Sequence, residues 1–292
     1  MSDVFWRNDF VEQHTVRHPR QLSSGNPQPR YPSVLVAIIV RNGESFLKFY
    51  LECLVNQKYP KDKIKIYIRT NNNTDRTSEI IKAWVGRFRD QYAYVEVDDG
   101  DLKVDLQRYR QHEWNRERLQ IIGELRNESL LRAAQIGCEY YFTFDVDTFI
   151  IDTTLWELVS LNLPIVAPFL RNENPNSLWS NYFSDIDQNG FHVSTPKYHA
   201  ILSRLIEGII EVPLVHCAYL IRSDVLKCVS YTSPHGGYEF MNFADSARRS
   251  GFLQYLDNRQ LYGYNITMDP NEPSAATTVR RLEGFIRQSR VP

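Results

Sequence analysis

Apolar runs and polar breaks alternate regularly along the first half of the chain. Residues 33–40 read SVLVAIIV, a continuous apolar run that predicts a strand covered on both faces. Leucines recur at helical spacing over residues 47–56, and isoleucines alternate along residues 64–68. A second stripe of apolar positions at helical spacing covers residues 80–88. The pattern therefore predicts strand, helix, strand and helix in turn.

The same alternation continues to the middle of the chain. Residues 92–97 predict a third strand, and the charged residues 98–116 predict a loop or lid. A helix expected over residues 116–134 leads into YYFTFDVDTFI at residues 140–150, which begins as the chain's most buried strand. Alternating strands and helices imply right-handed crossovers and a largely parallel sheet.

The alternation loosens after Asp147. Short strands are predicted over residues 164–168 and 252–256, and a longer strand over residues 212–221. A helix is predicted over residues 238–249. Since no internal repeat or hinge interrupts the chain, we expect one α/β domain with a Rossmann-like, mixed but largely parallel sheet flanked by helices.

Composition narrows the classes of function. The chain has 292 residues, of which 42% are hydrophobic and 24% charged, so a large core is expected. Its net charge is −1, and no basic excess favours nucleic acid or an anionic membrane as a partner. Residues 1–18 lack an apolar signal core, and no apolar run reaches membrane-spanning length. We expect a soluble and, by default, cytoplasmic protein.

Two carboxylates one residue apart, Asp145 and Asp147, follow the most apolar strand. A buried carboxylate is costly unless it is paired or bound to a metal. The loops at residues 41–44, 70–75 and 145–148 all leave the carboxyl ends of predicted parallel strands, where ligands bind in open α/β sheets. Amide and carboxylate side chains there would bind a base and ribose, with the two carboxylates holding a metal on a diphosphate.

No glycine-rich phosphate loop accompanies these loops, because neither GxxxxGK[ST] nor GxGxxG occurs in the chain. A divalent cation would therefore neutralise the diphosphate, and oxygen ligands suit Mg²⁺ or Mn²⁺. The plainer interpretation is that Asp145 and Asp147 form a turn and a cap for a helix over residues 153–161. The strand-end position and the two accompanying loops favour the metal site.

Nine segments carry a resemblance to a known family. In chain order they are VLVAIIVRN, YPKDKIKIYIRTNNNTDRTSEIIKAW, ELRNESL, YYFTFDVDTFI, PIVAPFL, WSNYF, VPLVHCAYLI, SARRSG and NRQLYGY. A DxD at a strand end resembles the GT-A nucleotide-sugar glycosyltransferases. The whole set, over about residues 33–264, is most similar to the N-terminal glycosyltransferase domain of the procollagen galactosyltransferases.

The resemblance implies a GT-A domain at residues 33–268, with a nucleotide-binding half (33–150) and an acceptor half (151–268). A flexible arm at residues 1–32 would precede it, and a tail at residues 269–292 would follow. The implied reaction is metal-dependent transfer of a hexose, galactose or glucose, from a UDP-sugar to a hydroxyl such as that of hydroxylysine in a collagen-like chain. Relatives of this kind work in the lumen of the endoplasmic reticulum.

The resemblance also implies roles for individual residues. Asp145 and Asp147, on either side of Val146, would hold Mn²⁺ and the diphosphate. Arg126 would orient a carboxylate or reach the phosphates. The donor-binding loops would place five further residues around the nucleotide: Arg41, Thr70, Asn71, Asn73 and Asp75.

Two positions depart from the family pattern. Asn71 stands where the family usually has an acid. Leu261 replaces a histidine in the family's NRxHYGY segment, so one possible metal ligand is missing.

Three further residues have both a structural and a functional interpretation. His216, after an apolar strand, is a core histidine, a metal ligand or an acceptor contact. Trp179 lies in a polar loop, where it fills the core or stacks on a sugar. Glu239 opens a helix, where it is either a favourable first-turn acid or the general base of an inverting single displacement. Asp245 is the second candidate for that base.

Two other classes of function compete with glycosyl transfer. A nucleotidyltransferase would use similar carboxylates, but typically with a Gly- and Arg-rich phosphate loop that this chain lacks. A non-catalytic carbohydrate- or collagen-binding protein would not need Asp145 and Asp147 together with the nucleotide loops. The sequence therefore favours a glycosyltransferase.

Overall fold

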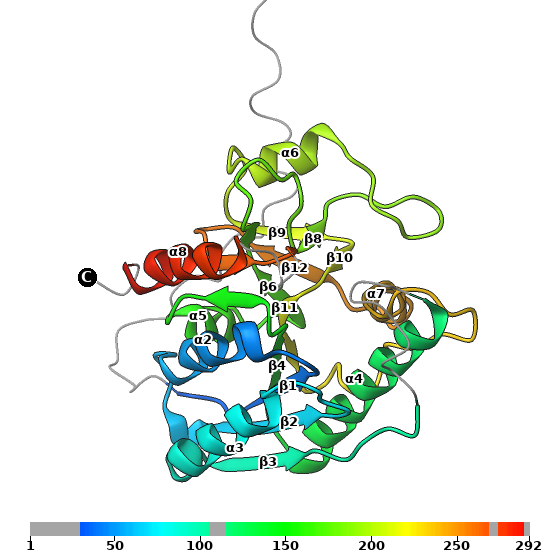
Figure 1. The fold of residues 1–292 in the computed structure, drawn as a ribbon. Coiled ribbons are helices and arrows are strands. Elements are labelled where there is room, and N and C mark those ends of the chain that lie inside the picture. Colours follow the sequence, from blue (N-terminus) through cyan, green and yellow to red (C-terminus); the bar gives the residue numbers. More distant parts are fainter. Residues whose placement is uncertain (1–29, 105–114, 269–273, 289–292) are drawn as a thin grey trace, which may run out of the picture.

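The computed structural model describes residues 30–104, 115–268 and 274–288. Most of the expected N-terminal arm and part of the expected lid at residues 98–116 lie outside these ranges. A single mixed sheet forms the centre of the molecule (Figure 1), in the strand order β3-β2-β1-β4-β11-β6-β12-β9. Its strands are β1 (Val34–Val40), β2 (Ile64–Thr70), β3 (Tyr94–Asp98), β4 (Tyr140–Phe144), β6 (Ile165–Pro168), β9 (Ile209–Val212), β11 (Ala218–Arg222) and β12 (Gln254–Asp257).

The first four strands of this order are parallel, as the alternating pattern predicted. β11 runs antiparallel between β4 and β6, while β12 pairs parallel with β6 and antiparallel with β9. The chain moves outward from β1 to β2 and β3, then returns to place β4 on the other side of β1. The crevice at the carboxyl ends of β1 and β4 is therefore a topological switch point, where ligands bind in such sheets.

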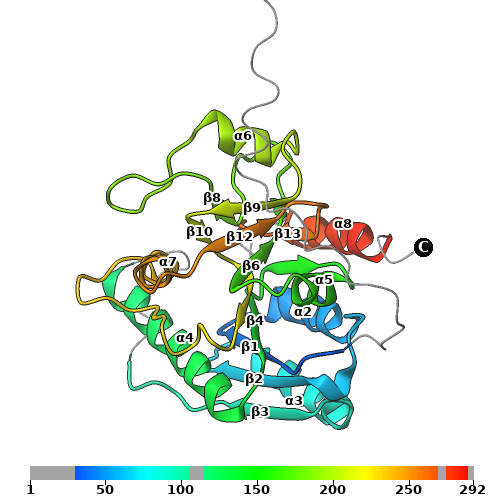
Figure 2. The ribbon, with the colours of Figure 1, turned by 180° about the vertical axis from the view of Figure 1, so that it is seen from behind.

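Helices cover both faces of the sheet (Figures 1 and 2). Even-numbered residues of β1 enter one core cluster with side chains of α2, α3, α5 and α8, while Leu35 and Ala37 enter the opposite cluster with α4, α6 and α7. This two-sided burial explains the unbroken apolar run of β1. The helices are α2 (Glu44–Val55), α3 (Thr77–Phe88), α4 (Arg116–Ile136), α5 (Thr154–Ser160), α6 (Pro196–Leu202), α7 (Glu239–Arg249) and α8 (Ala275–Gln288), with 3₁₀ turns at η1 (Lys61–Lys63) and η2 (Arg89–Gln91).

Two small sheets complete the structure. The first joins β5 (Thr148–Ile150), β13 (Gly263–Asn265) and β7 (Leu170–Asn172), and the second pairs β8 (Tyr182–Phe183) with β10 (Leu214–Val215). The strand expected over residues 212–221 is in fact broken into β10 and β11. Cys217 lies at φ 62°, in the left-handed region, and the Ala218 N–H donates to the His216 carbonyl at 2.7 Å. This tight turn ends one strand and starts the next.

Residues 275–288, within the expected tail, form helix α8 instead. Val279, Leu282 and Ile286 are buried in the same cluster as α2 and β5. Arg287 pairs with Glu52 of α2 at 2.7 Å. The apolar positions at 279, 282 and 286 have helical spacing, so the sequence carried this signal. None of the helices in the described ranges is long and apolar enough to span a membrane.

Candidate active site

The loop after β4 and the loop after β1 meet at the switch point. Asp145 and Asp147 follow β4, and Val146 between them faces Gly43 in the loop after β1. A Cβ atom built on Gly43 would lie 2.6 Å from Val40 Cγ2 and 3.4 Å from Val146 Cγ2. Only glycine therefore fits here without displacing its neighbours. Val146 helps to position the two carboxylates by packing, a role that needs no ligand contact.

Hydrogen bonds join the loops after β1 and β2. The Asn42 N–H donates to Asn73 Oδ1 at 2.9 Å, and the Glu44 N–H donates to Asp75 Oδ2 at 3.0 Å. Asn73 Nδ2 also donates to Thr70 Oγ1 at 2.7 Å. These bonds hold the first turn of α2 against the second loop. The structure therefore gives Asn73, Thr70 and Asp75 a part in the shape of this edge of the sheet.

Two polar side-chain atoms of these loops are buried without a partner among the residues that the structure describes. They are the Asn71 Oδ1 atom and the Arg41 Nε atom. Burial lowers the pKa of Arg41, as does the nearby Arg118, while Asp75 opposes the shift. A buried polar atom without a partner is costly and is normally satisfied by water or a ligand. Asn71 and Arg41 are thus the predicted donor-site residues with hydrogen-bonding capacity left for a nucleotide.

Arg126 of α4 connects a predicted metal ligand, Asp145, with the predicted general base, Glu239. Its Nη2 atom donates to Asp145 Oδ1 at 2.7 Å, and its Nε atom lies 3.7 Å from Glu239 Oε1. The guanidinium also lies 5.7 Å from the centre of the Tyr231 ring. Both Arg126 and Glu239 are buried. The structure therefore brings α4, the end of β4 and the start of α7 together around one cation.

Burial raises the pKa values of two carboxylates at the site, Asp147 and Glu239. The pKa of Asp147 rises to about 7, chiefly through burial and next through the charge of Asp145, with Glu173 adding to the effect. Burial also raises the pKa of Glu239, although Arg126 opposes the shift. These raised pKa values indicate that additional positive charge at the site would stabilise the ionised carboxylates.

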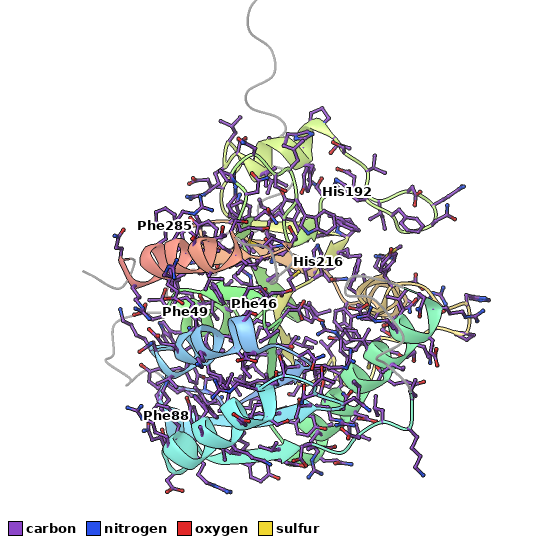
Figure 3. All side chains as sticks on the ribbon, viewed as in Figure 1. Phe46, Phe49, Phe88, His192, His216 and Phe285 are labelled. Atoms are coloured by element: carbon purple, nitrogen blue, oxygen red, sulfur yellow. The ribbon has the colours of Figure 1, made fainter. Side chains whose placement is uncertain are left out.

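His216 lies in the turn between β10 and β11, among aromatic rings (Figure 3). Its centroid is 5.3 Å from the ring of Trp179 and 5.2 Å from that of Phe240. Its Nδ1 atom contacts Cys217 Sγ at 2.9 Å, and its Nε2 atom is buried without a partner. Burial lowers the pKa of His216 to about 4, so the ring is neutral at pH 7.

Asp245 lies elsewhere on α7. Its carboxylate pairs with Arg249 at 2.7 Å and with Arg248 at 3.6 Å, on a partly exposed face of the helix. The structure therefore gives Asp245 a surface ion pair and does not bring it to Arg126. Among the described residues, no three His, Cys, Asp or Glu side chains form a group that could hold a metal. His216 accordingly does not join Asp145 and Asp147 as a third ligand in this structure.

Sequence reasoning missed two residues that adjoin the carboxylates. The Cys217 carbonyl accepts from the Asp145 N–H at 2.8 Å and so fixes the end of β4. Glu173 accepts hydrogen bonds from the Thr267 and Met268 N–H groups, both at 3.0 Å, and raises the pKa of Asp147. Neither position has a distinctive local pattern, because its neighbours come from distant parts of the chain.

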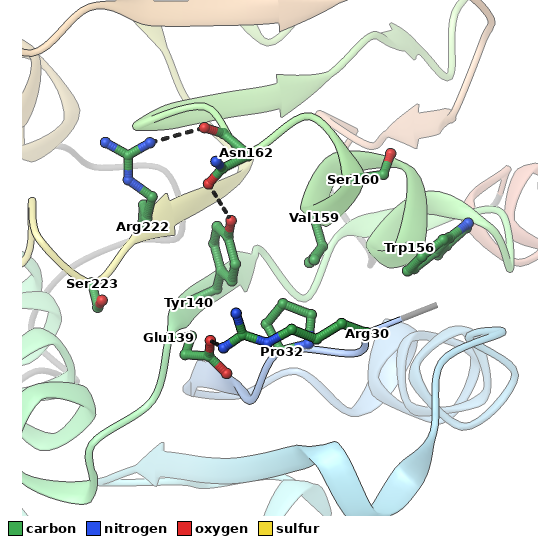
Figure 4. Close-up of a pocket in the computed structure, with 10 residues that line it drawn as sticks. All are labelled: Arg30, Pro32, Glu139, Tyr140, Trp156, Val159, Ser160, Asn162, Arg222 and Ser223. Carbon is green, nitrogen blue, oxygen red and sulfur yellow. Dashed lines mark hydrogen bonds and ion pairs between the residues drawn. The ribbon is translucent and has the colours of Figure 1, made fainter. Parts of the chain in front are cut away.

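A separate cavity of about 400 Å³ lies beside the starts of β1 and β4 (Figure 4). Arg222 in its wall pairs with Asp224 and donates to the Asn162 carbonyl at 2.9 Å. Tyr140 donates to the Asn162 side chain, and Arg30 pairs with Glu139. These polar groups satisfy one another, and the cavity lies away from the carboxyl ends of the strands. We do not include it in the candidate active site.

Solved structures with a similar fold include complexes with nucleotide sugars. The structure of S. aureus TarS 1-349 in complex with UDP-GlcNAc matches with a TM-score of 0.53 and 16% identity, covering 87% of this chain and 66% of that one. The mannosyltransferase PcManGT from Pyrobaculum calidifontis, in complex with GDP-Man and Mn²⁺, matches with a TM-score of 0.51 and 14% identity, covering 90% and 66%. These likenesses show the GT-A fold, as the sequence predicted.

Curated relatives are similar over most of this chain. Procollagen galactosyltransferase 2 of Homo sapiens is 33% identical over 244 residues, covering 80% of this chain and 38% of the relative. Procollagen galactosyltransferase 1-B of Xenopus laevis is 30% identical over 82% of this chain and 40% of its own length. The "Probable inactive glycosyltransferase 25 family member 3" of Bos taurus is 29% identical over 84% and 42%. The chain thus spans about two fifths of the length of these relatives.

The family model described as "Glycosyltransferase family 25, N-terminal domain" matches residues 31–287, which include helix α8. This match covers nearly all of the described residues. With the switch-point carboxylates and the GT-A fold, it shows that the chain belongs to glycosyltransferase family 25.

Proposed function

We propose that this chain transfers a hexose, galactose or glucose, from a UDP-sugar to a hydroxyl acceptor with the help of a divalent metal. The observation that carries the proposal is the meeting of Asp145, Asp147, Arg126 and Glu239 at the switch point of the sheet. The names of the curated relatives and the nucleotide-sugar complexes of the structural neighbours support it.

Asp145 and Asp147 would hold Mn²⁺ or Mg²⁺. The donor set fits, because carboxylate oxygens are ligands that both ions prefer. The raised pKa of Asp147 supports the same conclusion, since a cation beside Asp145 and Asp147 would relieve their repulsion. When bound, the ion would neutralise the donor diphosphate and stabilise UDP as the leaving group.

Asn71 and Arg41 would contact the donor nucleotide. The Asn71 Oδ1 atom, buried and without a partner, can accept the ring N–H of uracil. Arg41 would place its positive charge toward the ribose or the phosphates. The hydrogen bonds of Asn73 and Asp75 would keep the loop that carries Asn71 in position.

Glu239 would act as the general base. A single displacement on an α-linked UDP-sugar gives a β-linked product and needs a group that accepts the proton of the attacking hydroxyl. Asp145 and Asp147 are committed to the metal in this proposal. Burial brings the pKa of Glu239 upward, which suits a base at neutral pH. Arg126 would orient Glu239 relative to Asp145, because it contacts both.

The acceptor that we propose is the hydroxyl of hydroxylysine in a collagen-like chain. The support is the similarity to two relatives named procollagen galactosyltransferases. A second candidate function is non-catalytic binding of a carbohydrate or collagen-like chain, which the similarity to a relative named as probably inactive favours. Hydrolysis of UDP-galactose or UDP-glucose with Mn²⁺ would distinguish the two, because a binding protein does not release UDP.

Calorimetric titration of UDP with Mn²⁺ and with chelator tests the metal site. We expect Mn²⁺ to strengthen UDP binding in the wild type, and Asp145→Asn or Asp147→Asn to abolish that gain while the fold remains intact. Asp62→Asn is the matched control, because the Asp62 side chain is 76% exposed and lies outside the site. Equal UDP affinity of the wild type in chelator and in Mn²⁺ would refute the metal site.

A further inference from the structure

Exposed apolar side chains gather in one part of the acceptor half. Of the eleven large apolar side chains that are exposed among the described residues, five come from three short segments near α7: Leu178, Trp179, Phe191, Val193 and Tyr238. Single exposed apolar residues are normal, but a contiguous group indicates a binding surface. Whether these five form a group depends on what lies between them.

A row of four rings connects the first segment with α7. The ring of Trp179 lies 5.3 Å from that of His216, which lies 5.2 Å from Phe240. Phe240 in turn lies 5.5 Å from Tyr238. The two ends are accessible, since Trp179 is 39% and Tyr238 is 37% exposed. We call Trp179, His216, Phe240 and Tyr238 the aromatic row.

The remaining segment joins the row through Phe183. His192, between Phe191 and Val193 in the chain, has its ring 5.0 Å from that of Phe183. Phe183 lies 5.7 Å from His216. Figure 3 shows His192 and His216 on neighbouring parts of the molecule, near α7. The segment that carries Phe191 and Val193 therefore joins the same cluster of rings through His192.

The aromatic row runs up to the candidate active site. His216 precedes Cys217, whose carbonyl accepts from the Asp145 N–H at 2.8 Å. Glu239 lies between Tyr238 and Phe240 in the chain and has its carboxylate 3.7 Å from Arg126. The predicted base and the end of the aromatic row therefore lie on consecutive residues at the start of α7.

His216 offers one further contact. Its side chain is 4% exposed, and its Nε2 atom has no protein partner. Because Nδ1 is engaged with Cys217, Nε2 has one hydrogen bond to give or accept in either tautomer. The backbone amide of an extended peptide presents both a donor and an acceptor.

We propose that the aromatic row binds the polypeptide on either side of the acceptor hydroxyl, as an extended, proline-rich chain. This inference rests on the proposed function and assigns it an acceptor-binding surface. Proline-rich chains in the polyproline conformation dock on grooves and surfaces lined by aromatic rings. A single sugar ring is the weaker candidate, because two further rings separate the exposed ends of the row, Trp179 and Tyr238.

The first test measures peptide binding without turnover. The probe is a synthetic Gly-X-Y peptide rich in proline with one hydroxylysine, titrated by calorimetry in the absence of donor. We expect Trp179→Ala and Tyr238→Ala each to weaken binding about tenfold, the usual scale for truncating an aromatic contact at an interface. Trp179→Phe keeps a ring and should retain most of the affinity. Phe285→Ala is the matched control, since Phe285 is 47% exposed but lies on α8.

The second test compares transfer to the peptide with transfer to free hydroxylysine. Trp179→Ala should lower kcat/KM for the peptide about tenfold and leave kcat/KM for free hydroxylysine and UDP affinity unchanged. A thermal melt checks that each variant is folded. Unchanged peptide affinity in folded Trp179→Ala and Tyr238→Ala would overturn the inference. It would also be overturned if these variants kept their peptide affinity and instead lost affinity for methyl galactoside. Peptide binding that depends on Trp179 without any transfer would support the aromatic row and reject the proposed enzyme.

Discussion

Glu239 and Asp145 share the charge of Arg126, and this arrangement separates two tasks within the site. Nη2 of Arg126 holds Asp145 at 2.7 Å, whereas the contact with Glu239 is looser, at 3.7 Å. The looser contact leaves the Glu239 carboxylate less committed to Arg126, and burial raises the pKa of Glu239. Arg126 therefore holds Asp145 in place beside the proposed metal, and Glu239 is the carboxylate suited to accept a proton.

Glu239→Gln is the sharpest test at this scale. The substitution keeps the size of the side chain and removes the proton acceptor, so kcat should fall by about 10²–10⁴. UDP and Mn²⁺ affinity should stay near the wild-type values, because the ligands of the metal remain. Glu211→Gln, at an exposed position on β9, serves as the control. Transfer at the wild-type rate would remove Glu239 from the mechanism, and an α-linked product would reject single displacement.

The sequence predicts some site residues better than others. Asp145, Asp147 and Glu239 could be predicted as candidates because a strand end and a helix start are local patterns. Asn73 and Asp75 were predicted to contact uridine, but hydrogen bonds across about thirty residues use their side chains to join two loops. Which polar groups of a loop pair with protein and which stay free is a long-range property. No spacing rule distinguishes Asn71 from its neighbours.

At the scale of elements, regular alternation was predicted well and irregular turns were not. The parallel strands and α2, α3 and α4 follow from periodic apolar positions. The break at Cys217 does not, because apolar residues at 214–215 and 218–221 continue the strand pattern on either side of it, and a single residue in the left-handed region makes the turn. That break places the Cys217 carbonyl against Asp145. The turn at Cys217, which the apolar pattern did not predict, therefore helps to fix the position of Asp145.

A substitution of Gly263 in β13 tests whether the sheet of β5, β13 and β7 supports the candidate site. A Cβ atom there would lie 1.9 Å from the Phe149 carbonyl oxygen in β5, the strand that follows Asp147. Gly263→Ala must therefore push the backbone of β5 aside, and we expect a loss of about 1–3 kcal/mol in the free energy of unfolding, with weaker Mn²⁺-dependent UDP binding.

Gly86→Ala is the matched control for Gly263→Ala. Gly86 lies within α3, and a Cβ there would meet nothing within 4 Å. The same substitution should raise the free energy of unfolding by about 0.5–1 kcal/mol, because alanine favours a helix over glycine. Urea denaturation of both variants gives the comparison. If Gly263→Ala were as stable as the wild type, the close approach of β13 to β5 would be wrong.

On the scale of the whole molecule, the two predicted halves share one sheet. β4 of the first half pairs with β11 of the second along residues 140–144 and 218–222. Helix α8, from the end of the chain, packs on the cluster that contains α2 and β1. The site residues lie on both halves, with Asp145 and Arg126 in the first and Glu239 in the second. Cooperative folding of the halves is therefore a condition for the site to form.

Helix α8 provides the test of this integration. Leu282 is 1% exposed, so Leu282→Ala should lower the free energy of unfolding by about 2–5 kcal/mol, the usual range for a buried leucine. Leu205→Ala should change it little, because Leu205 is 82% exposed. Near-ultraviolet circular dichroism and UDP binding, followed along one urea titration, should lose signal at the same concentration in each variant. An unchanged urea midpoint for Leu282→Ala would show that residues 275–288 do not contribute to the stability of the domain. Separate transitions of the two signals would show that the halves fold independently.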